Sequence, residues 1–317
     1  MTGEIHSPSP ALFPRPILIA GPTAVGKSEV ALRLAEKLGG EIISVDSMQV
    51  YRGLDLGTAK PTFAERARVP HHLIDVVDLT APFDAAKFVE LANKAVAEIQ
   101  SRGRVPIFCG GTGLYFKAYL EGLGEAPVGD PKLRAELEAA PLADLLRELE
   151  RRDPVTFSKI DRKNPRRVIR AVEVIRMTGK PFSAQRAEWN PASILHPPSS
   201  HFFGLSRPAA DLHARINVRV DKMFAAGLVE ETRRLFTHGL VENQTAMQAI
   251  GYRQVVEHLR GERSLPETIE LVKIKTRQFA KRQMTWFRRQ MNLEWIELTP
   301  LDSSDRAAAL VNQHLRK

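Results

Sequence analysis

The sequence predicts an α/β fold in which a parallel sheet core is interrupted by a helical insertion. Three observations predict it. In the first third of the chain, short continuous apolar runs alternate with helical stretches, which is typical of a parallel sheet covered on both faces. Residues 123–199 are rich in Arg, Glu, Leu and Ala, with repeated prolines and no apolar strand run. An apolar run at 201–205 then returns the chain to the sheet.

The core elements follow one another in the order expected of such a fold. Phe88, Leu91, Ala95 and Ile99 recur at helical spacing, which predicts a helix with one apolar face. The expected helices are Ser28–Leu38, Asp84–Arg102, several between Pro208 and Asn292, and a terminal helix from Ser303. The expected strands are Ile17–Ala20, Glu41–Asp46, His72–Asp78, Val105–Cys109, His201–Leu205 and Trp295–Leu298.

These elements divide the chain into three parts. Residues 1–16 contain four prolines and are expected to be a disordered leader; Glu4 and the lack of a long apolar stretch exclude a secretion signal. Residues 17–122 and 200–317 are expected to form the core. Residues 123–199 form the insertion, which ends in a Pro/Ser loop at 196–200.

Composition and charge exclude several classes of protein. Of the 317 residues, 43% are hydrophobic and 26% are charged, as in ordinary globular chains, so a mainly disordered or membrane-spanning chain is excluded. The single cysteine, Cys109, excludes an internal disulfide and a cysteine-based zinc site, and it favours a reducing, cytoplasmic compartment. The net charge of +9 favours a polyanionic partner such as nucleic acid, although a solubilising surface would explain it equally well.

A phosphate-binding loop follows the first expected strand. Its residues match G-x-x-x-x-G-K-[ST], and a strand and a helix flank them as the motif requires. Backbone amides and the helix N-terminus attract phosphate oxygens, Lys27 adds a positive charge, and the Ser28 hydroxyl can hold Mg²⁺. The motif therefore predicts a P-loop NTPase-like core that binds a diphosphate. Its members are Gly21, Pro22, Thr23, Ala24, Val25, Gly26, Lys27 and Ser28.

The position of the nearest carboxylate separates this chain from motor and switch NTPases. Those proteins place an acid after a further apolar strand to hold Mg²⁺ and water, whereas Val105–Cys109 runs into Gly-Gly-Thr-Gly. Asp46 instead follows the strand after the loop helix. It is suitably placed to act as a base on an acceptor lying over the phosphates. Small-molecule kinases also carry acids there, so Asp46 alone leaves the class open.

Further motifs complete an ordered set between residues 17 and 297. SVDSMQVYR at 44–52 follows the phosphate loop. The others are DLGTAKP at 55–61, HHLID at 71–75, GGTGLY at 110–115, RAVEV at 170–174, TGK at 178–180, IGY at 250–252 and TRQFAKRQMTWFR at 276–288. In this order they closely resemble the bacterial tRNA dimethylallyltransferases. A phosphate loop alone would be weak evidence, whereas the ordered set is very specific.

The resemblance implies a reaction and its substrates. A dimethylallyl group would pass from dimethylallyl diphosphate to N6 of adenosine 37 in tRNA, in a context of adenosines at positions 36 to 38, and diphosphate would leave. It also implies Mg²⁺ as cofactor, a cytoplasmic monomer and no membrane association. Ser28 stands where many relatives have Thr and keeps the hydroxyl. The Cys/His zinc module of eukaryotic relatives is missing from this sequence.

The resemblance also implies roles for particular residues. Asp46 would take the proton from N6, while Lys27 and Arg219 would stabilise the leaving diphosphate. The residues beside Asp46 and the glycine turn would contact a base that is extruded from its stack, as base-modifying enzymes require. Without the resemblance, Arg219 would be interpreted as a solvated helix arginine and Asp46 as a loop-capping carboxylate. The implied tRNA contacts are Asp46, Ser47, Met48, Gln49, Thr112, Arg134, Arg166, Arg167, Val168, Ile169, Arg170, Lys281 and Arg282.

The charge distribution agrees with an RNA partner. Between residues 271 and 293 the chain has seven Lys or Arg and no acid, which is typical of a phosphate-binding surface. Trp286 and Phe287 lie within this run and are expected to be core anchors rather than platforms for bases. Tyr51 and Tyr115 would either line the prenyl pocket, stack on a base or pack in the core. His71 and His72 are expected to be structural.

Two other functions remain open on the residues alone. A P-loop kinase of a small metabolite or nucleoside would consume ATP and need no RNA. A non-catalytic tRNA-binding protein with a vestigial loop would not depend on Lys27 or Asp46. The basic run at 273–289 argues against the first, and the intact Gly26-Lys27-Ser28 sequence argues against the second.

Overall fold

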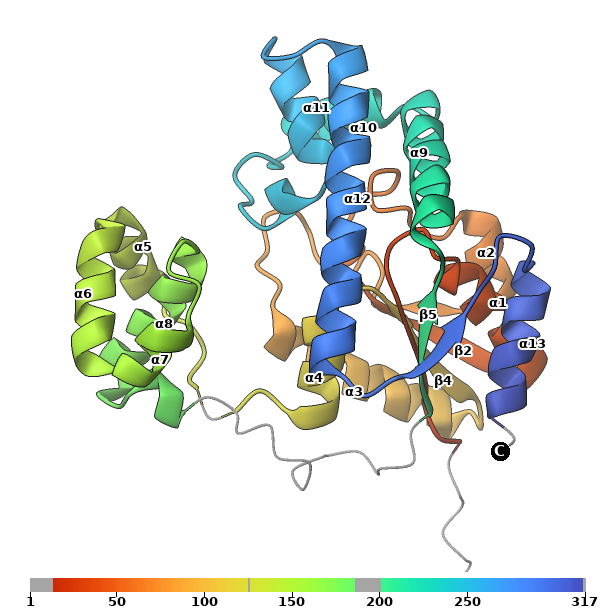
Figure 1. The fold of residues 1–317 in the computed structure, drawn as a ribbon, viewed down its shortest axis with the longest axis horizontal. Coiled ribbons are helices and arrows are strands. Elements are labelled where there is room, and N and C mark those ends of the chain that lie inside the picture. The colour runs from red at the N-terminus through yellow and green to blue at the C-terminus, as the bar shows by residue number, and fades with distance from the viewer. Residues whose placement is uncertain (1–13, 125, 186–200, 316–317) are drawn as a thin grey trace, which may run out of the picture. The chain divides into compact units, whose positions relative to one another are not determined.

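The computed structural model describes residues 14–124, 126–185 and 201–315. Six parallel strands form one sheet in the order β3-β2-β4-β1-β5-β6 (Figure 1). The parallel α/β core expected from the sequence is therefore confirmed. The strands are β1 Ile17–Ala20, β2 Gly40–Val45, β3 His71–His72, β4 Val105–Gly110, β5 His201–Ser206 and β6 Glu294–Glu297.

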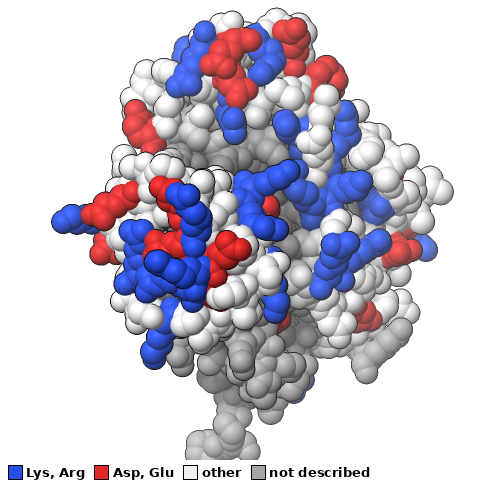
Figure 2. Space-filling model, turned by 60° about the vertical axis from the view of Figure 1, so that its left-hand side comes forward, with Lys and Arg blue, Asp and Glu red and all other residues white. Residues whose placement is uncertain are grey.

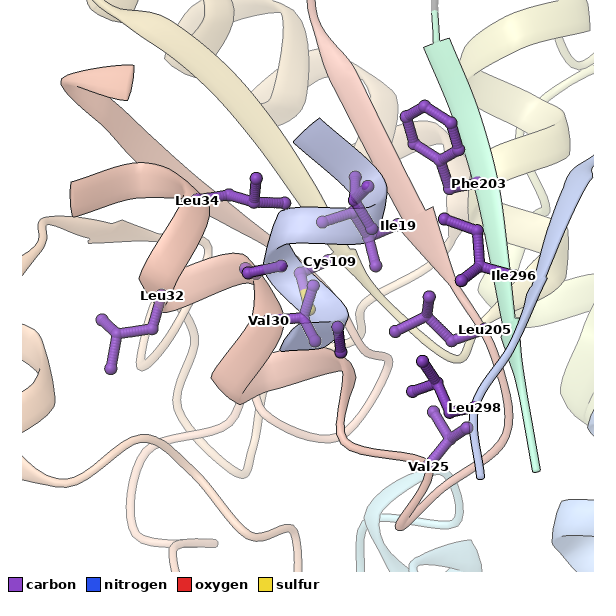
Figure 3. Packing of buried hydrophobic residues seen from close by; sticks show 14 of the residues in the cluster. Ile19, Val25, Val30, Leu32, Leu34, Cys109, Phe203, Leu205, Ile296 and Leu298 are labelled. Carbon is purple, nitrogen blue, oxygen red and sulfur yellow. The ribbon is translucent and has the colours of Figure 1, made fainter. Parts of the chain in front are cut away.

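Successive residues of a strand point to opposite faces of the sheet, and helices cover both faces. On one face, Ile19 of β1 and Cys109 of β4 lie in a buried cluster with Val30 and Leu34 of the first helix (Figure 3). On the other face, Phe108 of β4 contacts Tyr119, with ring centroids 4.4 Å apart. Burial on both sides explains why the strands read as continuous apolar runs.

The chain divides into two compact units, Met1–Tyr119 with His196–Lys317, and Leu120–Leu195. The sequence expectation for the smaller unit was residues 123–199. The larger unit holds the sheet and most of the helices. These are α1 Lys27–Leu38, α2 Phe63–Arg68, α3 Ala85–Ser101, α4 Gly113–Glu121, α9 Ala209–Ala225, α10 Leu228–Phe236, η3 Ala246–Gln248, α11 Tyr252–Leu259, α12 Leu265–Gln290 and α13 Ser304–His314.

Local sequence explains where the main helices begin and end. The Asp84 side chain accepts a hydrogen bond from Lys87 N and caps α3. Ser264 and Glu267 form a capping box that starts the 26-residue helix α12. Gly39 ends α1 in the left-handed conformation that glycine adopts without strain. The helices expected at 28–38 and 84–102 are therefore confirmed to within one residue at each end.

One expected strand is wrong. His72–Asp78 does not continue as a strand beyond His72, because Leu73 and Asp75 have φ angles of 61° and 57°. These left-handed residues turn the chain away from β2. The next β-type pairing of this segment is at Val77, which forms an isolated parallel bridge with Tyr51.

The smaller unit is helical among its described residues. Leu145, Leu149, Val168 and Val172 form its buried core. Three of its helices begin with a capping residue followed by proline, namely Asp130-Pro131, Asp153-Pro154 and Asn164-Pro165. Proline fits the first helical turn, whose N–H groups have no partner in the helix. The elements are α5 Pro131–Ala139, α6 Leu142–Arg152, α7 Pro154–Lys159, α8 Pro165–Thr178 and η1 Phe182–Ala184.

Two expectations fall on residues that the structure does not describe. The leader lies largely within 1–13, and the Pro/Ser loop at 196–200 lies within 186–200. Among the described residues, no helix combines the length and apolar character that crossing a membrane requires.

Candidate active site

The phosphate loop joins β1 to α1 in a conformation that its glycines make possible. Gly26 precedes α1 with a φ of 107°, a region that favours glycine. A Cβ on Gly21 would lie 2.8 Å from the carbonyl oxygen of Leu205, too close for any other residue. Ala24 adopts a φ of 65°, which costs free energy in a residue that has a Cβ.

Two arginines from the far part of the chain hold this loop. Arg215 Nε donates to the Ala24 carbonyl oxygen at 2.9 Å, and Arg207 Nε donates to that of Val25 at 2.9 Å. The first of these carbonyls belongs to Ala24, the residue with the positive φ angle. The sequence gives no signal for either arginine, since they lie 182 and 191 residues from their partners.

The charges of Arg219 and Asp46 both act on Lys27. Burial lowers the pKa of Lys27 to about 8; the charge of Arg219 also lowers it, and that of Asp46 raises it. Burial and the neighbouring Arg215 lower the pKa of Arg219. Lys27 Nζ donates to the Pro22 carbonyl oxygen at 3.1 Å, inside its own loop. Two of the residues implied as catalytic, Asp46 and Arg219, are therefore close enough to the third, Lys27, to affect its pKa.

Asp46 begins the loop that leaves β2. Its Oδ1 accepts hydrogen bonds from the backbone N–H groups of Met48 at 2.8 Å and Gln49 at 3.3 Å. Within the described residues, Oδ2 takes no hydrogen bond. The loop-capping interpretation is thus correct for Oδ1.

The glycine turn after β4 lies against this loop. The N–H groups of Gly111 and Thr112 both donate to the Val45 carbonyl oxygen at 3.2 Å. Thr112 Oγ1 accepts a hydrogen bond from Ser47 N at 3.1 Å. A Cβ on Gly110 would lie 2.0 Å from the Val45 carbonyl oxygen, so only glycine permits this approach. The structure therefore brings Thr112 and Ser47 together beside Asp46.

Gln283 of α12 ties the phosphate loop to the glycine turn. Its Oε1 accepts a hydrogen bond from Thr23 N at 2.8 Å, and its Nε2 donates to the Gly111 carbonyl oxygen at 2.9 Å. The side chain is buried. A glutamine within a basic run carries no sequence signal for this role.

Gln49 stabilises the loop that follows β2 through hydrogen bonds of its side chain. Its Oε1 accepts a hydrogen bond from Ser44 Oγ at 2.8 Å, and its Nε2 donates to the Thr58 carbonyl oxygen at 3.1 Å. Its side-chain amide is thus already hydrogen-bonded inside the protein. The predicted contact with tRNA would therefore require the Gln49 backbone, or a side chain that has changed conformation.

The DLGTAKP segment at 55–61 is anchored to two helices. The buried carboxylate of Glu231 on α10 accepts hydrogen bonds from Leu56 N at 3.0 Å and Tyr252 Oη at 2.5 Å. Tyr252 Oη in turn accepts one from Gly57 N at 3.0 Å. A Cβ on Gly57 would lie 2.4 Å from the Tyr252 ring. The motif is therefore held in place by α10 and α11.

Aromatic and histidine residues near the sheet have structural contacts. Tyr51 is fully buried, and Tyr115 stacks on Phe88 with centroids 4.5 Å apart. His72 Nε2 lies 2.7 Å from the buried carboxylate of Glu41, and His71 Nδ1 lies 2.7 Å from the Val69 carbonyl oxygen. Core packing is therefore the interpretation that the structure favours for both tyrosines.

In the smaller unit, the residues expected to contact tRNA fall into three groups. Arg134 and Arg170 both pair with the buried carboxylate of Glu173, Arg170 at 2.7 Å. Val168 and Ile169 are buried in the core of this unit, so their side chains are not available to RNA. Arg166 and Arg167 have exposed side chains at the start of α8.

The seven cations of α12 are not equivalent. Lys273 pairs with Asp221 at 2.8 Å and Glu270 at 2.9 Å, so its charge is largely offset. Lys281 and Arg282 are exposed, and within the described residues no carboxylate lies within 4 Å of them. Many Lys and Arg side chains, with Asp and Glu among them, lie on the face that Figure 2 shows.

The comparisons with known proteins identify one family. The family model for IPP transferases matches residues 49–290. The chain is 47% identical over 287 residues to the tRNA dimethylallyltransferase of Geobacter metallireducens, covering 89% of this chain and 92% of that protein. It is 46% identical over 300 residues to tRNA dimethylallyltransferase 1 of Trichlorobacter lovleyi, covering 93% and 98%.

Solved structures agree with this assignment. The full-length tRNA isopentenylpyrophosphate transferase of Bacillus halodurans is 40% identical, with a TM-score of 0.68 and 95% of each chain covered. A eukaryotic dimethylallyltransferase acting on tRNA is 28% identical, with a TM-score of 0.78, covering 96% of this chain and 80% of that one. Identity of this extent, together with the family model, leads to one conclusion. The chain belongs to the IPP transferase family.

Proposed function

We propose that this chain transfers a dimethylallyl group from dimethylallyl diphosphate to N6 of adenosine 37 in tRNA. The bond between the allylic carbon and the diphosphate oxygen breaks, and a bond from that carbon to N6 forms. Diphosphate leaves, and one N6 proton is taken up by a base. The names of the relatives, at 47% and 46% identity over most of the chain, support this activity.

The phosphate loop would hold the diphosphate of the donor. Its glycines allow backbone N–H groups to face phosphate oxygens, and the N-terminus of α1 adds a partial positive charge. Lys27 and Arg219 would offset the negative charge that develops as the allylic bond breaks. Arg207 and Arg215 bind the loop carbonyls, so they would preserve the loop geometry without touching the donor.

Asp46 would act on the acceptor. The amine of adenine is a weak nucleophile, and a carboxylate within hydrogen-bond reach can orient it and accept its proton. Oδ2 is the oxygen available for this, because Oδ1 is held by Met48 and Gln49. The adenine must leave its stack to reach this oxygen, and Ser47 and Thr112 lie beside the position it would take.

We propose that Mg²⁺ is a cofactor that would be held jointly with the diphosphate. The Ser28 side chain is exposed in the first turn of α1, next to Lys27, and supplies the hard oxygen ligand that Mg²⁺ prefers. Diphosphate oxygens would supply further ligands. When bound, the ion neutralises negative charge on the diphosphate oxygens.

tRNA would be held by exposed cations of both units, Lys281 and Arg282 on α12 and Arg166 and Arg167 on α8. We propose that the target lies among adenosines at positions 36 to 38, and that the protein acts as a cytoplasmic monomer. An RNA acceptor explains why α12 places unneutralised charge near the phosphate loop, which a kinase of small molecules would not need.

The observation that carries the proposal is the identity of 47% and 46% with tRNA dimethylallyltransferases over 89% and 93% of the chain. Its test is incubation of the full chain with Mg²⁺, dimethylallyl diphosphate and unmodified tRNA, followed by nucleoside mass analysis. We expect N6-dimethylallyladenosine, and none when guanosine replaces adenosine 37. Equal product from the guanosine-substituted tRNA would contradict the position, and no product from either would contradict the activity.

A further inference from the structure

A buried lysine and its acidic partners take no part in the reaction described above. Lys60 belongs to the DLGTAKP segment, and its side chain is only 2% exposed. Its Nζ donates to Asp55 Oδ1 at 2.8 Å, to Asp75 Oδ1 at 2.5 Å and to the Tyr51 carbonyl oxygen at 2.6 Å. Because a lysine ammonium has three N–H donors, none remains for a phosphate or a base of the RNA. The role of this cation therefore lies within the protein.

Asp75 is held as a charged partner of this lysine. Its Oδ1 accepts the hydrogen bond from Lys60, and its Oδ2 accepts one from Arg66 Nη1 at 2.7 Å. Burial raises the pKa of Asp75, but the hydrogen bonds from Lys60 and Arg66 outweigh burial and hold this pKa below its usual range. The carboxylate is therefore ionised at neutral pH, and it joins the segment at 55–61 to the segment that follows β3.

The backbone on both sides of this ion pair is strained. Ala59, next to Lys60, has a φ of 51°, while Leu73 and Asp75 have φ angles of 61° and 57°. Residues other than glycine persist in this region only where the surrounding contacts determine their conformation. The pair of Lys60 with Asp75 supplies such a contact between the two segments. It therefore holds two irregular segments in one arrangement.

The same two residues hold the loop that follows β2. The Asp75 N–H donates to the Gln49 carbonyl oxygen at 3.1 Å. Lys60 Nζ binds the carbonyl oxygen of Tyr51, two residues further along this loop. The Gln49 N–H in turn donates to Asp46 Oδ1 at 3.3 Å. Lys60 and Asp75 thus bind the stretch of backbone whose N–H group holds the proposed general base.

We propose that Lys60 and Asp75 are positioning residues that orient the Asp46 carboxylate toward the acceptor amine. The proposal rests on the function proposed above, in which Asp46 is the base. Neither side chain would touch tRNA or the donor. Displacing a catalytic group by about 1 Å can cost about 10²-fold in rate, so a small loosening of this backbone would lower kcat.

Two variants remove the ion pair while keeping the chain direction. Asp75→Asn keeps the backbone N–H and adds little strain, because asparagine adopts positive φ angles more readily than most residues. Lys60→Met removes the ammonium from a side chain of similar length. For both we expect kcat to fall about 10- to 100-fold. The KM for dimethylallyl diphosphate and the Kd for tRNA should stay within about twofold of wild type, since neither residue binds a substrate.

Asp78→Asn is the matched control. Asp78 lies three residues beyond Asp75 and also pairs with a cation, Arg52 at 2.8 Å, but both of these side chains are exposed. Because exposed ion pairs contribute little, the kcat of Asp78→Asn should equal that of wild type.

A double-mutant cycle with Asp46→Asn separates positioning from a general structural role. If Lys60 acts through Asp46, Lys60→Met should lower the single-turnover rate of wild type but change that of Asp46→Asn by less than about twofold. The same is expected of Asp75→Asn. A merely structural loss would lower both rates by the same factor. Thermal unfolding of each variant identifies misfolding, and if Lys60→Met does not fold, Asp75→Asn is used for the cycle.

Hydrogen exchange of the peptide covering residues 46–52 measures the positioning without the reaction. Exchange should be faster in Lys60→Met and Asp75→Asn than in wild type, and unchanged in Asp78→Asn.

Three outcomes would overturn the proposal. The first is an equal loss of rate in both backgrounds of the cycle, and the second is a wild-type kcat in both variants. The third is weaker tRNA binding by Lys60→Met with a smaller salt dependence, which would make Lys60 a phosphate contact. If the wild-type chain forms no N6-dimethylallyladenosine, the proposed function is rejected, and hydrogen exchange alone decides whether Lys60 and Asp75 hold this loop.

Discussion

Gln283 accepts a hydrogen bond from the backbone N–H of Thr23 at 2.8 Å, although 260 residues separate them. Through its other amide atom it donates to the Gly111 carbonyl oxygen. One buried side chain therefore joins the loop proposed to hold the donor, the turn beside the acceptor and the helix proposed to bind tRNA. Gln283 thus links the two segments that are proposed to bind the two substrates.

Replacing Gln283 by Leu should impair the donor site more than tRNA binding. The change removes the partner of the partly buried Thr23 N–H and of the buried Gly111 carbonyl; an unpaired buried polar group costs about 1–3 kcal/mol. We expect the KM for dimethylallyl diphosphate to rise about tenfold or more and kcat to fall, while the Kd for tRNA stays within about twofold. Steady-state kinetics and RNA binding check this. Gln248→Leu is the control, since that exposed side chain bonds only within its own turn. A KM equal to that of wild type would contradict the linking role.

Asp46→Asn should remove the proposed general base while preserving the conformation of the loop that follows β2. The asparagine oxygen can still accept the hydrogen bonds from Met48 and Gln49, so the fold and the tRNA affinity should change little. General-base catalysis typically contributes 10²–10⁴-fold, and we expect kcat to fall by about that factor. Single-turnover rates and binding measurements separate the two effects. Normal turnover combined with a large loss of tRNA affinity would assign Asp46 to binding.

Donor affinity should weaken as the pH rises through the pKa of Lys27. Burial lowers that pKa to about 8, so the positive charge is present below this pH and is lost above it. The KM for dimethylallyl diphosphate should therefore rise between about pH 7 and pH 9. In Lys27→Arg the charge persists over this range because arginine stays protonated, and the rise should be smaller. The pH profiles of the two proteins test this, and parallel profiles would contradict it.

Lys281 and Arg282 should contribute to the salt dependence of tRNA binding. Each phosphate contact that is lost reduces the slope of log K against log salt by about 1, so the Lys281→Ala/Arg282→Ala variant should have a slope smaller by about 1–2. Lys273→Ala is the matched control on the same helix, because Asp221 and Glu270 already offset its charge. Equal slopes for the double variant and wild type would mean that this face does not meet phosphate.

Local patterns predicted the parts of the fold that depend on neighbours in sequence. The phosphate loop, the strand before it and the helix after it follow from a single stretch, as does the capping of α3 by Asp84. The strand expected at 72–78 was wrong because left-handed residues at 73 and 75 end the pairing at once. Apolar composition does not reveal such a change of backbone direction.

Contacts between distant segments lay beyond the sequence patterns. Arg207, Arg215 and Gln283 each hold the phosphate loop from 180 residues away or more, and no spacing rule links such positions. Glu173 is a charged residue in an apolar helix face, and only the structure shows that it pairs with Arg134 and Arg170. The motifs thus predicted which chemistry to expect, and the long-range contacts explain how the chain positions it.

The identity of the diphosphate in the phosphate loop is the central claim, and its fate can be measured directly. Dimethylallyl diphosphate labelled on its allylic carbon is incubated with the full chain, Mg²⁺ and unmodified tRNA, with and without ATP. We predict one diphosphate released for each label found in adenosine 37, no requirement for ATP, and loss of both products in Lys27→Ala. Label that stays in the donor while the γ-phosphate of ATP is consumed would contradict the account and favour a kinase.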